Sequence, residues 1–118
     1  MRLGDISVMR DWGWAPEYVE AMWMMLQQDT ADDYIVATGQ THSLEEMVET
    51  VFSQLGLNWH DHVETNPDLL RPTDIKSSYA DPGKAEKKLG WKAQYRMKEV
   101  AAMMVEDCLK HMTDNPVA

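Results

Sequence analysis

Helical signals occur in four segments of this chain, and the first two lie in its N-terminal half. The first predicted helix opens at Pro16, a residue suited to the first helical turn, and runs to about Gln28. Its apolar stripe consists of Val19, Met22, Trp23 and Leu26. The second predicted helix begins with a capping box between Ser43 and Glu46, and Gly56 ends it in a left-handed conformation.

The other two predicted helices lie toward the C-terminus. Asp81 is placed to cap a short helix that Gly90 ends. A last helix covers about residues 97–112. Its inward-facing residues are expected to be Met97, Val100, Ala101, Met104, Cys108 and Met112. Cys108 is therefore expected to be buried rather than reactive.

Three short runs have the composition of strands. Residues 34–38 (YIVAT) are almost wholly apolar, which is typical of a strand buried on both faces of a parallel sheet. Residues 57–64 alternate loosely between apolar and polar positions, and residues 75–80 are a further short candidate. The pattern predicts a single α+β domain over residues 1–118, mostly helical, with three or four helices and two to four short strands.

Composition narrows the partners of this domain. The net charge of −9 disfavours nucleic acid and anionic membranes, because both attract a basic surface. No apolar run approaches the ~18 residues of a membrane span, and we expect no signal peptide. Cys108 is the single cysteine, so the chain can form no internal disulfide, and a cytoplasmic location is expected. Ten methionines suit either an irregular core or an oligomer interface.

The segment Arg71-Pro72-Thr73-Asp74 carries the most specific chemistry. A guanidinium group matches phosphate oxygens bidentately, and a carboxylate accepts hydrogen bonds from vicinal hydroxyls. Pro72 stiffens the turn that holds the two groups.

This segment belongs to a longer series of motifs. The series comprises residues 10–23 (RDWGWAPEYVEAMW), residues 34–39 (YIVATG), residues 41–43 (THS), residues 71–74 and residues 81–91 (DPGKAEKKLGW). In this order the motifs resemble the GDP-mannose 4,6-dehydratases of the extended short-chain dehydrogenase/reductase family. The resemblance covers about residues 3–107 and corresponds to the C-terminal, substrate-binding third of such an enzyme.

The resemblance implies a site and a chemistry. Full-length members are lyases that use bound NADP to oxidise the sugar at C4, eliminate water across C5–C6 and return the hydride. By motif, Arg10 and Arg71 would clasp the nucleotide diphosphate, and Asp74 would bind the ribose hydroxyls. Asp74 departs from the more frequent glutamate of this branch and is one methylene shorter, which changes its reach to the ribose.

The catalytic parts of the family are not found among these residues. No Gly-x-x-Gly-x-x-Gly follows a strand, so the NADP-binding part is absent and we expect no cofactor in this chain. None of the four tyrosines has a lysine four residues later, so the Tyr-x-x-x-Lys proton donor is missing as well. We assign no catalytic residue, and the chain alone is not expected to be a dehydratase.

Plainer interpretations stand beside these assignments. Arg10 and Arg71 could serve as surface ion-pair partners, and Asp74 as a turn residue. Residues 60–62 (HDH) place two histidines and a carboxylate together, but without a further spaced ligand we predict a solvated strand and no metal. Lys84, Lys87 and Lys88 indicate the solvated face of a short helix.

Two functions remain open. In the first, the chain is a truncated dehydratase-like protein that binds GDP-mannose or GDP weakly through Arg10, Arg71 and Asp74. In the second, it is a non-enzymatic, self-associating module without a ligand. The first helix and residues 34–38 would then meet a second copy, most simply in a homodimer.

Overall fold

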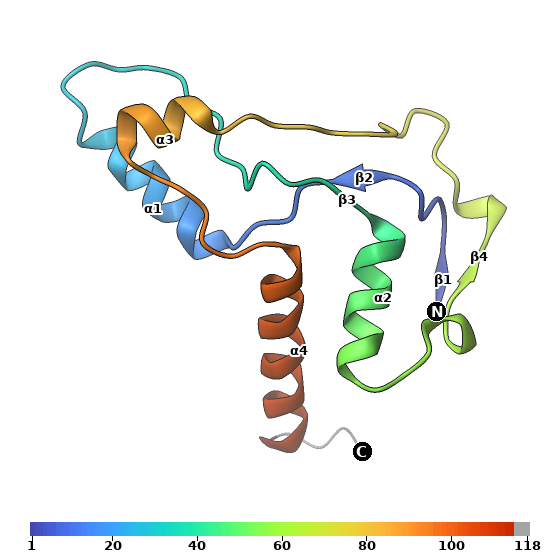
Figure 1. The fold of residues 1–118 in the computed structure, drawn as a ribbon. Coiled ribbons are helices and arrows are strands. Elements are labelled where there is room, and N and C mark those ends of the chain that lie inside the picture. The colour runs from blue at the N-terminus through green and yellow to red at the C-terminus, as the bar shows by residue number, and fades with distance from the viewer. Residues whose placement is uncertain (115–118) are drawn as a thin grey trace.

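Four α-helices and four two-residue strands make up the fold that a computed structural model describes for residues 1–114 (Figure 1). The elements are β1 (Arg2–Leu3), β2 (Met9–Arg10), α1 (Ala15–Leu26), β3 (His42–Ser43), α2 (Leu44–Gln54), the 3-10 helix η1 (Trp59–Asp61), β4 (Glu64–Thr65), the 3-10 helix η2 (Pro67–Leu69), α3 (Gly83–Leu89) and α4 (Met97–Asp114). The predicted α+β class and the predicted number of elements are confirmed.

Local signals fix where the helices begin and end. At the start of α2 the Ser43 hydroxyl accepts from the Glu46 amide at 3.1 Å, and the Glu46 carboxylate accepts from the Ser43 amide at 2.9 Å. Pro82, and not Asp81 as predicted, is the N-cap of α3, and the Asp81 carboxylate accepts from the Gly83 amide at 2.9 Å just before the helix. Gly90 ends α3 with φ +69°, a conformation that costs glycine little.

The strands form two small sheets within residues 1–114. β1 pairs in parallel with β4, and β2 pairs antiparallel with β3 through Met9↔Ser43 and Arg10↔His42. A single parallel bridge joins Met9 to Ser77, so the strand predicted over residues 75–80 shrinks to one position. These contacts bring three distant segments together beside Arg10.

Two strand predictions are wrong, for different reasons. Residues 34–38 form no strand, because within residues 1–114 no other segment exchanges backbone–backbone hydrogen bonds with them. Residues 57–64 were expected to be extended but contain η1. The Asn58 side chain accepts from the His60 amide at 3.2 Å and so stabilises a turn in place of a strand.

The best-packed region lies between α1 and α3. Its buried side chains are Ala21, Ala85, Leu89, Trp91 and Ala93, and partly buried residues of α1 and of residues 34–36 pack against them. Trp91 is 3% exposed and lies edge-on to the Tyr18 ring, with 6.0 Å between ring centroids. The segment after α3 thereby fills the space beside the helix pair.

The α2–α4 pair is less complete. Met97, Val100 and Ala101 are buried on the first turns of α4, as predicted. Met104, Cys108 and Met112 were also predicted to face inward, but all three are exposed, because no element within residues 1–114 covers that half of the helix. Within residues 1–114, no helix combines the length and the apolar character needed to cross a membrane.

The molecule is flat and open, with extents of 52 × 40 × 21 Å. Its radius of gyration is 17.4 Å, whereas a compact domain of this length has about 13–14 Å. The accessible surface of 8457 Å² compares with about 6,600 Å² for a compact monomer of this mass. The chain therefore leaves about 1,900 Å² more surface in water than a closed fold would.

Candidate nucleotide-sugar site

Arg10 is positioned by the small sheet around β2. Its neighbour Met9 pairs with Ser43 of β3 on one side and forms a parallel bridge with Ser77 on the other, so both edges of β2 are paired. The Met9 amide donates to the Lys76 carbonyl at 2.8 Å. The base of the Arg10 side chain is thus fixed relative to residues 75–78.

The structure brings Arg10 and Asp74 into direct contact. Arg10 Nη2 lies 2.9 Å from Asp74 Oδ1, and both side chains are about one-third exposed. Arg10 Nη1 donates to the Ile75 and Met9 carbonyls at 2.7 and 2.8 Å. The ion-pair interpretation of Arg10 is therefore realised, with Asp74 as its partner.

The backbone of Arg71 lies in the same turn as Asp74. The Asp74 amide donates to the Arg71 carbonyl at 3.2 Å and closes a turn around Pro72 and Thr73. The Arg71 side chain is exposed. The three residues singled out by motif thus lie on two segments held together by the Arg10–Asp74 contact.

Arg10 and Asp74 keep donor and acceptor groups that their contacts within residues 1–114 do not use. A guanidinium carries five N–H donors, and the three contacts of Arg10 use three of them, so within residues 1–114 two donors keep no protein acceptor. The contact with Asp74 uses Oδ1 only. Arg10 can therefore still donate to an anion, and Asp74 Oδ2 can still accept from a hydroxyl.

Asp11, next to Arg10, has a structural role that the sequence did not reveal. Its carboxylate accepts from the Thr38 amide and hydroxyl, the latter at 2.7 Å, and from the Gly39 amide at 2.9 Å. The Arg96 guanidinium donates to the Thr38 carbonyl on the other side. Thr38, the polar residue that follows the apolar run 34–37, was the available signal, because its amide needs a hydrogen-bond acceptor once it is buried.

Glu17 is a second residue whose role was missed. It lies in the first turn of α1 and is 8% exposed. Its carboxyl oxygens accept from the Gln94 amide at 2.8 Å and the Tyr95 amide at 3.3 Å, and its carbonyl accepts from Trp91 Nε1 at 2.9 Å. Glu17 therefore anchors the segment after α3 to α1 and is not a reactive group at the site.

The lysines of α3 are not merely a solvated face. Lys84 and Lys88 contact the Asp32 carboxylate at 2.7 and 3.1 Å, and Lys84 also lies 5.1 Å from the Tyr34 ring centroid. The hydrogen bond from Lys84, followed by those from the Asp33 amide and Lys88, lowers the pKa of Asp32 below its ordinary value. These contacts tie the loop after α1 to α3.

The described residues do not fit a metal or an NADP molecule. In the 1–114 range no group of three or more His, Cys, Asp or Glu residues is placed to hold a metal ion, and His60 lies in η1 rather than on a strand. β1 and β4 form the parallel pair, and neither leads through a glycine turn into an α-helix. Without that turn the backbone offers no cradle for a dinucleotide phosphate.

Comparison with known proteins agrees with the motifs. Residues 1–104 match the family model described as GDP-mannose 4,6 dehydratase. GDP-mannose 4,6 dehydratase 1 of Arabidopsis thaliana is 45% identical over 108 residues, covering 92% of this chain and 30% of that protein. The chain thus spans less than a third of the length of this relative.

Solved structures show the same fold in larger enzymes. The dTDP-glucose 4,6-dehydratase of Bacillus anthracis, in complex with NAD, superposes with a TM-score of 0.82 at 18% identity, over 95% of this chain and 35% of that one. The RMD protein of Pseudomonas aeruginosa, complexed with NADPH, gives a TM-score of 0.78 at 19% identity, over 91% of this chain and 35% of that one. The present fold therefore corresponds to about a third of each of these nucleotide-cofactor proteins.

Proposed function

This chain belongs to the GDP-mannose 4,6-dehydratase family. We propose that its 118 residues are a nucleotide-sugar-binding portion of such an enzyme and are not catalytic by themselves. The observation that carries the proposal is the juxtaposition of Arg10, Asp74 and the Arg71 turn. Two guanidinium groups on two adjoined segments match the negative charge of a diphosphate, and the carboxylate beside them can accept hydrogen bonds from ribose hydroxyls.

The roles follow from the groups that remain available. Arg71 and the two remaining donors of Arg10 would bind diphosphate oxygens, and Asp74 Oδ2 would accept from a ribose hydroxyl. Charge-assisted bonds of this kind contribute about 1.5–3 kcal/mol each. Because these residues match less than a third of the relative and offer few contacts, we expect weak binding of GDP-mannose or GDP, with a Kd on the order of 1 mM.

The test is a chemical-shift titration of the ¹⁵N-labelled chain with GDP-mannose, GDP and guanosine. GDP-mannose and GDP are expected to bind alike and guanosine far more weakly, because the diphosphate supplies the charge. The shifts should centre on residues 10 and 71–75. Arg71→Ala should weaken GDP binding at least 10-fold, the loss expected from one charge-assisted contact.

Arg2→Ala is the matched control, because Arg2 is also exposed but lies in β1 and pairs with Glu64. It should leave the titration unchanged. Equal affinity of Arg71→Ala and the unchanged chain, or shifts centred elsewhere, would contradict the assigned site. Absence of any saturable shift at millimolar GDP would remove the ligand-binding function altogether.

A second candidate function is self-association without a ligand. It is favoured by the exposed stripe of α1, which comprises Val19, Met22, Trp23 and Leu26. Beside it, within the described residues, the backbone of residues 34–37 makes no hydrogen bond. Unpaired backbone and apolar surface of this kind favour association with another chain.

A cytoplasmic location is proposed from composition alone, since the single cysteine allows no internal disulfide.

A further inference from the structure

Arg10 donates to two neutral groups and to one charged group. Nη1 gives both of its N–H groups to carbonyls, those of Met9 and Ile75, and Nη2 gives one N–H to the Asp74 carboxylate at 2.9 Å. The N–H groups left for an anion are therefore Nε–H and the second N–H of Nη2. An anion that uses both of them shares the nitrogen Nη2 with Asp74.

This sharing decides how near an anion comes to the Asp74 carboxylate. The two N–H groups of one guanidinium nitrogen point about 120° apart, and an acceptor lies about 2.9 Å from that nitrogen. Two acceptors on Nη2 are then about 5 Å from each other. This separation is shorter than the Debye length of about 8 Å at physiological salt, so salt screens the repulsion only in part. At the dielectric constant of bulk water, two like unit charges about 5 Å apart lower an affinity about 4-fold.

The backbone holds Asp74 in this position. The carbonyl of the next residue, Ile75, accepts from the same guanidinium at 2.7 Å. On the other side, the Asp74 amide closes a turn on the Arg71 carbonyl at 3.2 Å. The carboxylate therefore stays beside Arg10 unless these bonds break, and a ligand of Arg10 binds with the charge of Asp74 in place.

Other carboxylates of the neighbouring segments have different partners. Asp11 accepts from the Gly39 amide at 2.9 Å, and Asp5 pairs with Lys76 at 3.2 Å. Within residues 1–114, Asp74 is the one carboxylate in contact with the Arg10 guanidinium. Asp74 is therefore the negative group that an anion on Arg10 meets first.

A ligand with hydroxyl groups offsets this repulsion. The contact with Arg10 uses Oδ1 of Asp74 and leaves Oδ2 for a further donor. A hydroxyl that donates to a carboxylate forms a charge-assisted hydrogen bond. A nucleoside diphosphate carries the phosphate charge and the vicinal ribose hydroxyls in one molecule, whereas a diphosphate without the ribose diol meets the repulsion and gains no such bond.

We propose that Asp74 makes this site selective for nucleotides with a free ribose diol, because its charge, 2.9 Å from Arg10, weakens the binding of other diphosphates. The inference rests on the proposed function and adds a second role to Asp74. Besides accepting from the ribose, the carboxylate repels diphosphates that lack the diol. Selectivity of this kind comes from a repulsive group as well as from an attractive contact.

The experiment compares GDP with 2′,3′-dideoxy-GDP, which has the same base and diphosphate but no ribose hydroxyl. Both are titrated at one low ionic strength into the ¹⁵N-labelled chain and into Asp74→Asn, which keeps the shape and removes the charge. Dideoxy-GDP should bind the unchanged chain roughly 10-fold more weakly than GDP, or weaker still. It should bind Asp74→Asn about 4-fold more tightly than the unchanged chain, or tighter still, because the repulsion is removed. A residue that only accepted from the ribose would leave the affinity for dideoxy-GDP unchanged.

Two control variants separate this effect from others. Asp74→Glu keeps the charge, and Asp61→Asn removes a charge from an exposed residue of η1; both should leave the affinity for dideoxy-GDP within about 2-fold. An equal gain in Asp61→Asn would refute the inference, because the total charge would then be the cause. If GDP shifted residues 10 and 71–75 but dideoxy-GDP bound the unchanged chain and Asp74→Asn equally, the selectivity would be refuted and the proposed site would stand. If neither nucleotide bound either chain, the proposed function would fail and this inference with it.

Discussion

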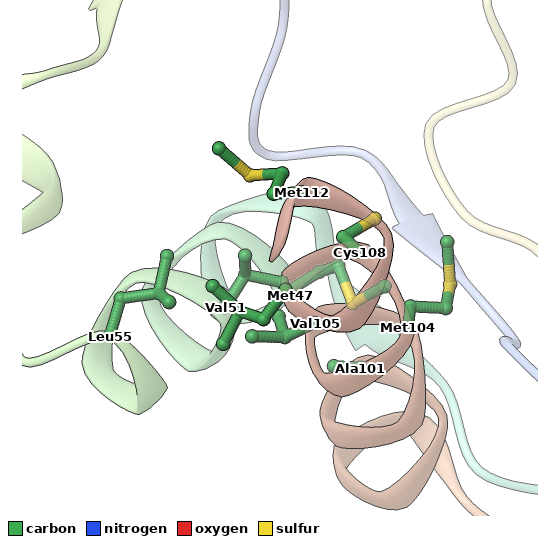
Figure 2. Close-up of a pocket in the computed structure, with 9 residues that line it drawn as sticks. Met47, Val51, Leu55, Ala101, Met104, Val105, Cys108 and Met112 are labelled. Carbon is green, nitrogen blue, oxygen red and sulfur yellow. The ribbon is translucent and has the colours of Figure 1, made fainter. Parts of the chain in front are cut away.

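The α1–α3 pair and the α2–α4 pair differ in what covers the seam between their helices. Over α1 and α3 the chain returns on itself, and Trp91 fills the seam while Glu17 accepts from two amides of the same segment. Over the C-terminal halves of α2 and α4 no segment of residues 1–114 returns, and a groove of about 310 Å³ is left between Val51 and Val105 (Figure 2). The two pairs lie in different parts of the molecule (Figure 1), and within residues 1–114 only the α1–α3 pair is closed by a further segment.

The contrast shows how a piece of a larger fold retains structure. A helix pair cannot bury its own seam, so a third element has to supply the missing side chains. Where that element comes within a few residues of the helix, as Trp91 follows α3, closure is local. Where it does not, the helix persists and its apolar face stays exposed.

The largest expected effect comes from emptying the closed seam. Trp91→Ala should lower the free energy of unfolding by about 3–5 kcal/mol, the usual cost of truncating a buried tryptophan. A domain of this size has about 5–15 kcal/mol in total, so the variant should lie near its unfolding transition. Urea denaturation followed by circular dichroism measures the difference.

Trp23→Ala is the control for this change, because the same side chain is removed from a position that is 62% exposed. It should cost less than about 1 kcal/mol. If the two variants lost similar stability, the closed seam would not be the main source of stability in this chain.

The next effect concerns the polar clamp on the same seam. Glu17→Gln keeps the shape but places an amide N–H₂ where an acceptor is needed by Gln94 or Tyr95. One buried donor then loses its partner, at a cost of about 1–3 kcal/mol. Glu20→Gln, exposed on the same helix, should change stability by no more than about 0.5 kcal/mol. Equal urea midpoints for the two variants would mean that the clamp contributes nothing.

How far the sequence could predict this fold depends on how local each signal is. The capping box at Ser43 and the glycine end of α3 at Gly90 act within a few residues, so both helices were predicted with nearly correct bounds. Strand pairing is not local. Residues 34–38 have the composition of a buried strand, but a strand forms only beside a partner, and within the described chain none is present.

The candidate site divides in the same way. Arg10, Arg71 and Asp74 could be singled out because each lies in a short motif of fixed residue types. Their contact could not be predicted, since Arg10 and Asp74 are 64 residues apart and meet through the pairing of Met9 with Ser77. The buried role of Glu17 was equally hidden, because its partners are backbone amides that carry no signature in the sequence.

The smallest expected effect concerns two exposed ion pairs, Asp32 with Lys84 of α3 and Glu106 with Lys110 within α4. The Lys84 hydrogen bond lowers the folded-state pKa of Asp32 below its ordinary 3.8, and the bond from Lys110 lowers the pKa of Glu106 on α4. A depressed carboxyl pKa stabilises the folded chain above the unfolded-state pKa, and this contribution is lost as the pH falls through the folded pKa. Asp32→Asn should therefore lower the melting temperature slightly at pH 6, and the difference from the unchanged chain should shrink at pH 3 and below.

Glu106→Gln should change the melting temperature in the same direction but by less. Its ion pair joins two residues of one helix, whereas Asp32 joins the loop after α1 to α3. If the difference in melting temperature between Asp32→Asn and the unchanged chain stayed constant down to pH 2, the contacts of Asp32 with Lys84 and Lys88 would not stabilise the α1–α3 region through charge.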